Sequence, residues 1–151
     1  MRIKTIKIRS IILNTDIQSG QLIKGFSFKK MNIIAIPNSE NLIPDFIVAC
    51  QMNEFGDISG PFLSHPNLEN RFVLLKSYDN INSAQNNYDT LSTISNSPYQ
   101  PFAFGIKPFD IWQIKTSSDE IGVILILEAR STKIGSSPFA EVKFKAKKII
   151  P

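Results

Sequence analysis

Residues 121–129 constrain the fold more than any other part of this 151-residue chain. The segment reads Ile-Gly-Val-Ile-Leu-Ile-Leu-Glu-Ala and is apolar at nearly every position. A strand with one wet face alternates between apolar and polar residues, whereas a short continuous apolar run is typical of a strand covered on both faces. We therefore predict that 121–129 lies in the middle of a sheet, with protein on both sides of it.

The composition also favours β-structure. Isoleucine occurs 24 times, phenylalanine 11, serine 16 and asparagine 12, against only 7 alanines. Ile and Phe suit strands, Asn and Ser suit turns, and a shortage of Ala is unfavourable for helices. Runs bounded by turn residues predict about eight strands, over 2–13, 22–28, 31–36, 45–52, 71–78, 109–116, 121–129 and 142–147.

These strands predict an all-β fold without a substantial helix. We expect one domain over residues 1–151, an antiparallel β-sandwich of jelly-roll or immunoglobulin-like type, with long loops at 53–70 and 79–101. A chain of this length can bury a core without a disulfide or a metal ion.

Several classes of protein are excluded. One cysteine and one histidine cannot make a disulfide framework or a Cys/His metal cluster. Glycine-rich phosphate loops and calcium-loop spacing are absent, so no cofactor or metal is predicted. No apolar run approaches the ~18–20 residues needed to span a membrane, and the basic start lacks a cleavage site, so we expect neither a transmembrane segment nor a secretory signal.

Catalytic candidates are few. Cys50 and His65 are the only thiol–imidazole pair, but Cys50 is in phase with apolar residues of a predicted strand and His65 lies in a Ser-His-Pro turn. We interpret them as a buried, inert cysteine and a surface histidine, and the acids Asp57, Glu69, Asp79 and Asp89 as solvated loop residues. The chain is therefore not predicted to be an enzyme.

Charge is distributed unevenly along the chain. Residues 1–30 carry a net charge of +6, residues 31–130 a net charge of −6 and residues 131–151 a net charge of +4. Lys143, Lys145 and Lys147 alternate with apolar residues and are expected to face water, and Arg9 lies in the basic first strand. We consider all four as assembly contacts; the alternative is that the lysines guard an edge strand against aggregation. Nucleic acid is not the favoured partner, because no aromatic residue interleaves the lysines to stack a base.

A second candidate surface contains tyrosines. Tyr78, Tyr88 and Tyr99 flank a stretch rich in Asn, Ser and Gln. Tyrosine combined with Asn and Ser is typical of recognition loops and would also suit a sugar-binding face. An ordinary polar surface loop is the competing interpretation.

Four segments together resemble small virion structural proteins of tailed and related bacterial viruses. They are 16–21, the strand ending Ile34-Ala35-Ile36-Pro37, 46–51 with 53–57, and 110–117 with 121–130. The resemblance implies a β-sandwich that decorates or completes a capsid, or forms a short fibre, with no catalytic residue.

Two functions follow as expectations. The first is a non-enzymatic virion component, located in the virion, whose partners are copies of itself or a capsid protein. The alternative is a carbohydrate- or surface-binding β-sandwich module, with a glycan partner at the loops 53–70 and 79–101; outside a virion we expect a cytoplasmic protein.

Overall fold

A computed structural model describes residues 4–7, 9–15, 23–91 and 93–150. These residues form eleven strands and one helix, and each strand pair among them is antiparallel. The predicted all-β class is confirmed. No helix in the described ranges is long and apolar enough to cross a membrane.

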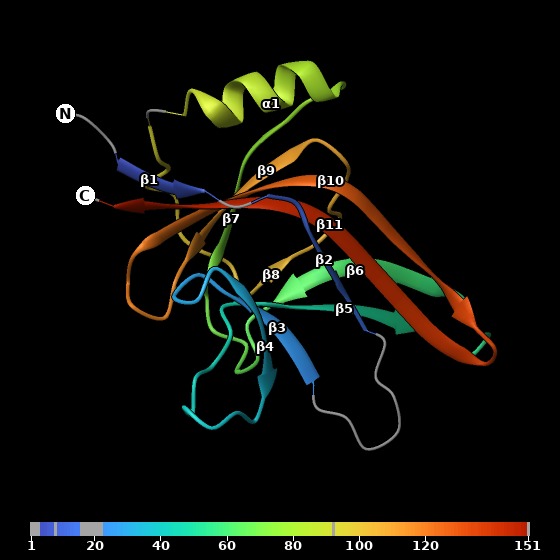
Figure 1. Ribbon diagram of the computed structural model, residues 1–151. Helices are drawn as coiled ribbons and strands as arrows, with labels where there is room; N and C mark the ends of the chain where they lie inside the picture. The colour runs from blue at the N-terminus through green and yellow to red at the C-terminus, as the bar shows by residue number, and fades with distance from the viewer. Residues whose placement is uncertain (1–3, 8, 16–22, 92, 151) are drawn as a thin grey trace.

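Three sheets and the helix make up the architecture. The largest sheet has the order β1-β11-β10-β9-β7, with β2 also pairing with β11. Its strands are β1 (Lys4–Lys7), β2 (Ile11–Asn14), β7 (Phe72–Ser77), β9 (Asp110–Lys115), β10 (Ile121–Ile134) and β11 (Ser137–Ile150). The small sheets are β3 (Ile23–Ser27) with β4 (Asn32–Ile36), and β5 (Ile47–Met52) with β6 (Ile58–Ser64) and β8 (Phe102–Ala103). Figure 1 shows both small sheets below the large one and helix α1 (Ile81–Asp89) above it.

Strand β10 is the central strand, as the apolar run predicted. It pairs with β9 on one side and β11 on the other. Ile124 and Ile126 belong to the main core, which faces the small sheets, while Val123 and Leu125 belong to a second core beneath α1. All four side chains are fully buried, so the run is apolar throughout because each face of the strand is covered.

Phenylalanines fill the main core. Phe26 packs edge-on against Phe28 and Phe144, with ring centroids 5.0 and 5.2 Å apart, and Phe46 lies 5.3 Å from Phe144. The Phe28 ring passes directly over Gly122, where a Cβ atom would lie 2.3 Å from the ring. The glycine within the central strand is therefore required by the close approach of an aromatic side chain.

The structure corrects three predictions about loops and strands. The first predicted strand is two strands, β1 and β2, with Arg9 between them. The predicted loop 53–70 contains β6, and the predicted loop 79–101 contains α1. Of the resembling segments, residues 16–21 lie outside the described residues.

Helix α1 forms in a polar sequence because its start is capped and one face is covered. The Asn80 side chain accepts a hydrogen bond from the Ser83 N–H at 2.8 Å, which satisfies one of the donors left over at a helix start. Ala84 and Tyr88, four residues apart on one face, are the buried residues of the helix. Tertiary packing therefore supplies stability that the weak helix formers of this segment do not.

Candidate functional site

Two of the three lysines predicted to face water, Lys145 and Lys147, contact α1. The Lys145 Nζ donates to Gln85 Oε1 at 2.6 Å, and the Lys147 Nζ donates to the backbone oxygen of Tyr88. Lys147 is 1 % exposed, so its predicted position in solvent is wrong. The alternation itself is confirmed, because Val142, Phe144 and Ala146 are all buried in the main core. The second face of β11 is shielded from solvent at Lys147 because helix α1 covers it. This helix lies in the segment 79–101, which was predicted to be a loop.

The edge-strand interpretation is also wrong. Strand β11 pairs with β10 along one side and with β1 and β2 along the other. Of the four predicted assembly contacts, Arg9 is exposed, and Lys143 and Lys145 are half-buried. Arg9 and Lys143 therefore keep accessible charge, whereas Lys147 does not.

Lys147 and Tyr88 fasten the end of the helix to the sheet. The ammonium group lies 4.5 Å from the centroid of the Tyr88 ring, within the range of a cation–π contact. It also meets a carbonyl in the last turn of α1, where the helix has negative partial charge and unsatisfied acceptors. This part of the basic segment thus acts within the chain.

The three candidate tyrosines do not share one surface. Tyr88 is 2 % exposed, and its burial raises the pKa of the phenol far above the usual range. Tyr99 is half-buried, and its hydroxyl accepts a hydrogen bond from Gln113 Nε2 at 2.8 Å. Tyr78 lines a cavity, whereas Tyr88 is buried, so the prediction of a joint recognition face fails for Tyr88.

The cavity beside Tyr78 lies between β7, the end of α1 and the segment that follows the helix. Its volume is about 400 Å³. Polar and apolar side chains alternate around it: Leu75, Lys76, Tyr78, Asn87, Thr90, Leu91, Thr93, Ile94, Ser95 and Ile111. Part of the predicted recognition segment therefore forms a pocket wall.

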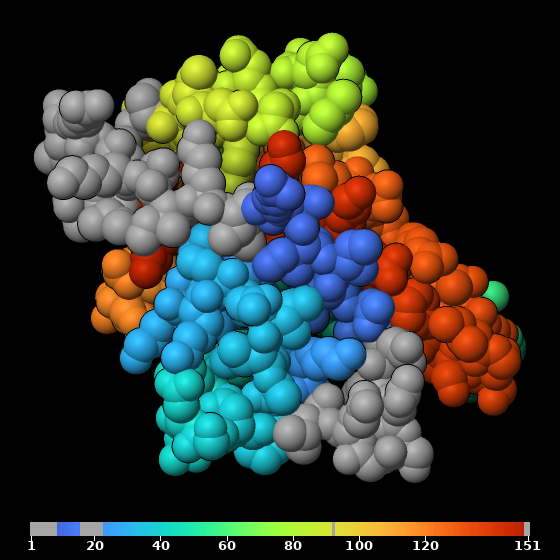
Figure 2. All heavy atoms as spheres, in the orientation of Figure 1, coloured from blue at the N-terminus to red at the C-terminus, as the bar shows by residue number. Residues whose placement is uncertain are grey.

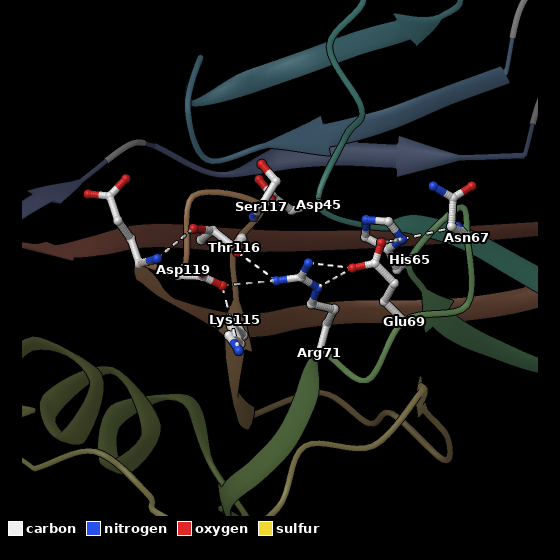
Figure 3. A network of polar contacts seen from close by, with 10 residues as sticks. Asp45, His65, Asn67, Glu69, Arg71, Lys115, Thr116, Ser117 and Asp119 are labelled. Carbon is white, nitrogen blue, oxygen red and sulfur yellow. Dashed lines mark hydrogen bonds and ion pairs between the residues drawn. The ribbon is translucent and has the colours of Figure 1, made fainter.

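A buried carboxylate connects three chain segments (Figure 3). The Asp45 carboxylate accepts a hydrogen bond from the Phe28 N–H at 2.6 Å and another from the Ser117 N–H at 2.8 Å. Asp45 is 1 % exposed. Desolvation raises the pKa of its carboxyl group, against the opposing effect of the two backbone donors. Asp45 therefore has a structural role, because its carboxylate joins the backbone at Phe28 to the backbone at Ser117.

The histidine of this network is buried. His65 is 2 % exposed, which corrects the predicted surface position. Its Nδ1 accepts a hydrogen bond from the Asn67 N–H at 3.0 Å, so the proton of the neutral ring is on Nε2. Desolvation lowers the pKa of His65, although nearby Glu69 opposes this effect.

Arg71 joins the histidine loop to the turn before β10. Its Nη1 donates to the Thr116 carbonyl oxygen at 2.8 Å, and its guanidinium is paired with Glu69 (Figure 3). The hydrogen bond from Arg71 lowers the pKa of Glu69, the main partner of this arginine. These contacts therefore join the loop that contains His65 and Arg71, the residue Asp45 and the turn before β10.

The register of β5 and β6 places Cys50 and His65 apart. Ser64 lies opposite Ile47, so His65 follows the end of β6 while Cys50 lies farther along β5. Four residues along a strand separate Phe46 from Cys50, roughly 13 Å at the usual rise. Burial raises the pKa of the half-buried Cys50 thiol, which disfavours the thiolate. In the described part of the chain, no three His, Cys, Asp or Glu residues are grouped to hold a metal ion.

Sequence reasoning missed an exposed apolar end on two neighbouring hairpins. Phe55 is 80 % exposed in the β5–β6 turn, and Ile134 is 59 % exposed at the end of β10. The two turns touch, because a Cβ atom at Gly56 would lie 2.6 Å from Lys133 Nζ. We name Phe55 and Ile134, with the turns that carry them, the hairpin end. Figure 1 shows the β10–β11 hairpin projecting from the body of the molecule toward this end.

An aromatic groove is a second missed surface. Phe104 is 58 % exposed and stacks on Phe102 with centroids 4.8 Å apart, while Phe62 lies 5.3 Å from Phe104. Phe102 and Phe104 border an apolar groove of about 410 Å³ that Leu74 and Trp112 also line. The Phe-Ala-Phe pattern at 102–104 is the sequence signal of this surface.

Comparison with known proteins identified no relative. No protein family, no curated protein and no solved structure matches this chain.

Proposed function

We propose that this protein is a non-enzymatic structural component of a virion, of the minor capsid, decoration or fibre type, that assembles with copies of itself or with a capsid protein. The observation that carries this proposal is the hairpin end, where Phe55 and Ile134 present apolar side chains to solvent. The two turns that carry these side chains meet at Gly56 and Lys133, and contiguous exposed apolar surface is a mark of interaction sites.

The geometry of the turn supports an assembly role. Asn53 Oδ1 accepts hydrogen bonds from the Phe55 and Asp57 N–H groups, both at 2.9 Å. Gly56 has a φ of +82°, a backbone conformation that favours glycine. The turn therefore holds Phe55 outward in a fixed position, and such preorganisation lowers the entropy cost of docking.

We also propose that the large sheet and the two small sheets are the two layers of the expected β-sandwich. The Phe26, Phe28, Phe46 and Phe144 cluster between them supports this interpretation. Helix α1 then forms an added layer on the other face of the large sheet.

The test is the mass of the protein in native solution as a function of concentration. We expect a closed assembly for the wild type and a folded monomer for the double variant Phe55→Ser/Ile134→Ser. Ile43→Ser is the matched control, because Ile43 is 46 % exposed in a loop outside the hairpin end. A wild-type monomer at all soluble concentrations, with no binding to capsid protein, would contradict the proposal.

A further inference from the structure

The cavity beside Tyr78 has the size and shape of a site for a small ligand. Small-molecule sites commonly enclose about 300–1,000 Å³, and this cavity encloses about 400 Å³. It is open to solvent, and its walls come from β7, Tyr78, the last turn of α1, residues 90, 91 and 93–95, and Ile111 of β9. A ligand would therefore contact parts of the chain that the sheet and helix hold in place.

The walls of this cavity are fixed before any ligand arrives. Gln113, fully buried, accepts a hydrogen bond from the Ser95 N–H at 2.8 Å and donates to the Ser95 carbonyl at 3.1 Å. At the helix end the Thr90 hydroxyl donates to the Asn86 carbonyl at 2.8 Å. On the opposite wall the Tyr78 N–H donates to the Phe109 carbonyl at 3.3 Å. Such a preformed pocket loses little conformational entropy on binding.

Its polar groups include both donors and acceptors. The Thr90 hydroxyl donates its proton to the helix and thus offers its lone pairs to a ligand. The Asn87 Nδ2 donates a hydrogen bond to the Ser83 carbonyl oxygen, so the Oδ1 of the same side chain remains as an acceptor for a ligand. Thr93, an exposed lining residue, adds a second hydroxyl group, and Lys76 adds an ammonium group that can donate. Ligands with several hydroxyl groups match this mixture, because each hydroxyl both donates and accepts.

Tyr78 is the aromatic residue among those that line the cavity in the described part of the chain. The ring is half-buried, and the Lys76 Nζ lies 5.4 Å from its centroid. A tyrosine side chain offers a flat apolar face and a polar tip, which suits a ligand that is apolar on one face and polar at its edges. A sugar ring has this character, with C–H groups on its faces and hydroxyls around its rim.

Charge argues against an anionic ligand. Lys76 is the cationic side chain among the lining residues described, whereas Asp79 and Asp89 are next in sequence to Tyr78 and Thr90. Binding of a phosphate or sulfate ordinarily relies on an arginine or on several donors aimed at one point. We propose that this cavity binds a neutral carbohydrate of one or two rings. This proposal does not rest on the assembly role.

The probes are neutral hexoses, N-acetylhexosamines and their disaccharides. Their binding to the full chain is detected by saturation-transfer NMR and by changes in amide chemical shifts. Binding is expected to shift amides of 76–78 and 87–95. We expect Tyr78→Ala to weaken binding by up to about tenfold, in the range of a lost aromatic contact. Thr93→Val should weaken it by roughly two- to tenfold, the loss of one hydrogen bond.

Thr132→Val is the control, because it makes the same chemical change at an exposed position of β10 remote from the cavity. Unfolding curves of each variant separate loss of binding from loss of fold, and Tyr78→Leu replaces Tyr78→Ala if that variant fails to fold. Three results would overturn the proposal: no shift with any probe, shifts that Thr93→Val and the tyrosine variants leave unchanged, or binding confined to sulfated or other acidic sugars.

Discussion

At the scale of single residues, two buried ionisable side chains stand where the sequence suggests exposed ones. Lys147 is enclosed by β11 and α1, and His65 by the loop that ends at Arg71. A buried charge or imidazole is tolerated only when neighbouring groups satisfy it. Both residues therefore make stability depend on specific partners.

We expect Lys147→Gln to lower the free energy of unfolding by about 1–3 kcal/mol, because the Tyr88 carbonyl loses a charged donor. Lys143→Gln, on the same face but half-buried, should change it by less than about 0.5 kcal/mol. Urea unfolding gives both values, and hydrogen exchange should show faster exchange in α1 for the Lys147 variant alone. Equal effects of the two changes would contradict the fastening role of Lys147.

His65 should make stability fall as the solution becomes more acidic. Its pKa in the folded protein is below the ordinary value of 6.5, so the unfolded chain takes up a proton at a higher pH than the folded chain does. The free energy of unfolding therefore decreases as pH falls below about 6.5 toward the folded pKa. Asp45, whose pKa is raised, contributes in the opposite direction, as its stabilising contribution is lost when pH rises through its folded pKa.

A comparison of wild type with His65→Asn isolates the histidine, because asparagine retains an acceptor for the Asn67 N–H. The free energy of unfolding, measured with urea at several pH values between 7 and 5, should change less steeply with pH in the variant than in the wild type. Glu69, Arg71 and Asp45 are the charged groups that act on His65, and all three are unchanged in it. If both proteins have the same slope, His65 is not the group responsible.

At the scale of elements, the sequence predicts β10 well and α1 not at all. The run 121–129 identifies a strand buried on both faces because burial on two sides requires continuous apolarity. Helix α1 has the sequence Ile-Asn-Ser-Ala-Gln-Asn-Asn-Tyr-Asp, which lacks strong helix formers apart from Ala84 and Gln85. Its signals are Asn80 as the cap and the spacing of Ala84, Tyr88 and Leu91, and they are weak beside the polar composition.

Strand β6 was not predicted from the sequence for a different reason. Its Gly60-Pro61 pair is typical of a turn, but here it lies where the pairing with β5 shifts register. The same limitation applies to the candidate site. Tyr78 was identified from residue type, whereas the cavity next to it depends on a helix that the sequence did not reveal.

Gly122 gives a test of the fit between β10 and Phe28, the residue that directly follows β3. We expect Gly122→Ala to lower the free energy of unfolding by roughly 1–3 kcal/mol, the usual cost of overpacking a core. The added methyl group would meet the fully buried Phe28 ring. Calorimetry of Gly122→Ala, Phe28→Leu and the double variant forms a cycle, in which the smaller leucine should relieve part of the cost of alanine. Strictly additive effects would show that the ring is not the obstacle.

At the scale of the whole molecule, the fold gathers the two basic ends of the chain. Strand β1 pairs with the last residues of β11, with Lys7 opposite Lys147, and β2 pairs with its middle. Figure 2 shows residues 9–15, in blue, against the orange-red of β11. Strands β1 and β2 of the basic first segment therefore lie beside β11 of the basic last segment, while the acidic segment between them supplies α1, β4 to β9 and most of β10.

This separation of charge predicts how assembly through the hairpin end responds to salt. Charged surfaces mainly accelerate encounter, while buried apolar contacts set the lifetime of a complex. The screening length falls from about 30 Å at 0.01 M salt to about 3 Å at 1 M. We therefore expect salt to lower the association rate several-fold and to leave the dissociation rate nearly unchanged, as measured by light-scattering kinetics. Arg9→Gln, at an exposed position, should lower the rate only at low salt, whereas Phe55→Ser should accelerate dissociation at every salt concentration. An association rate indifferent both to salt and to Arg9→Gln would show that the basic side takes no part in docking.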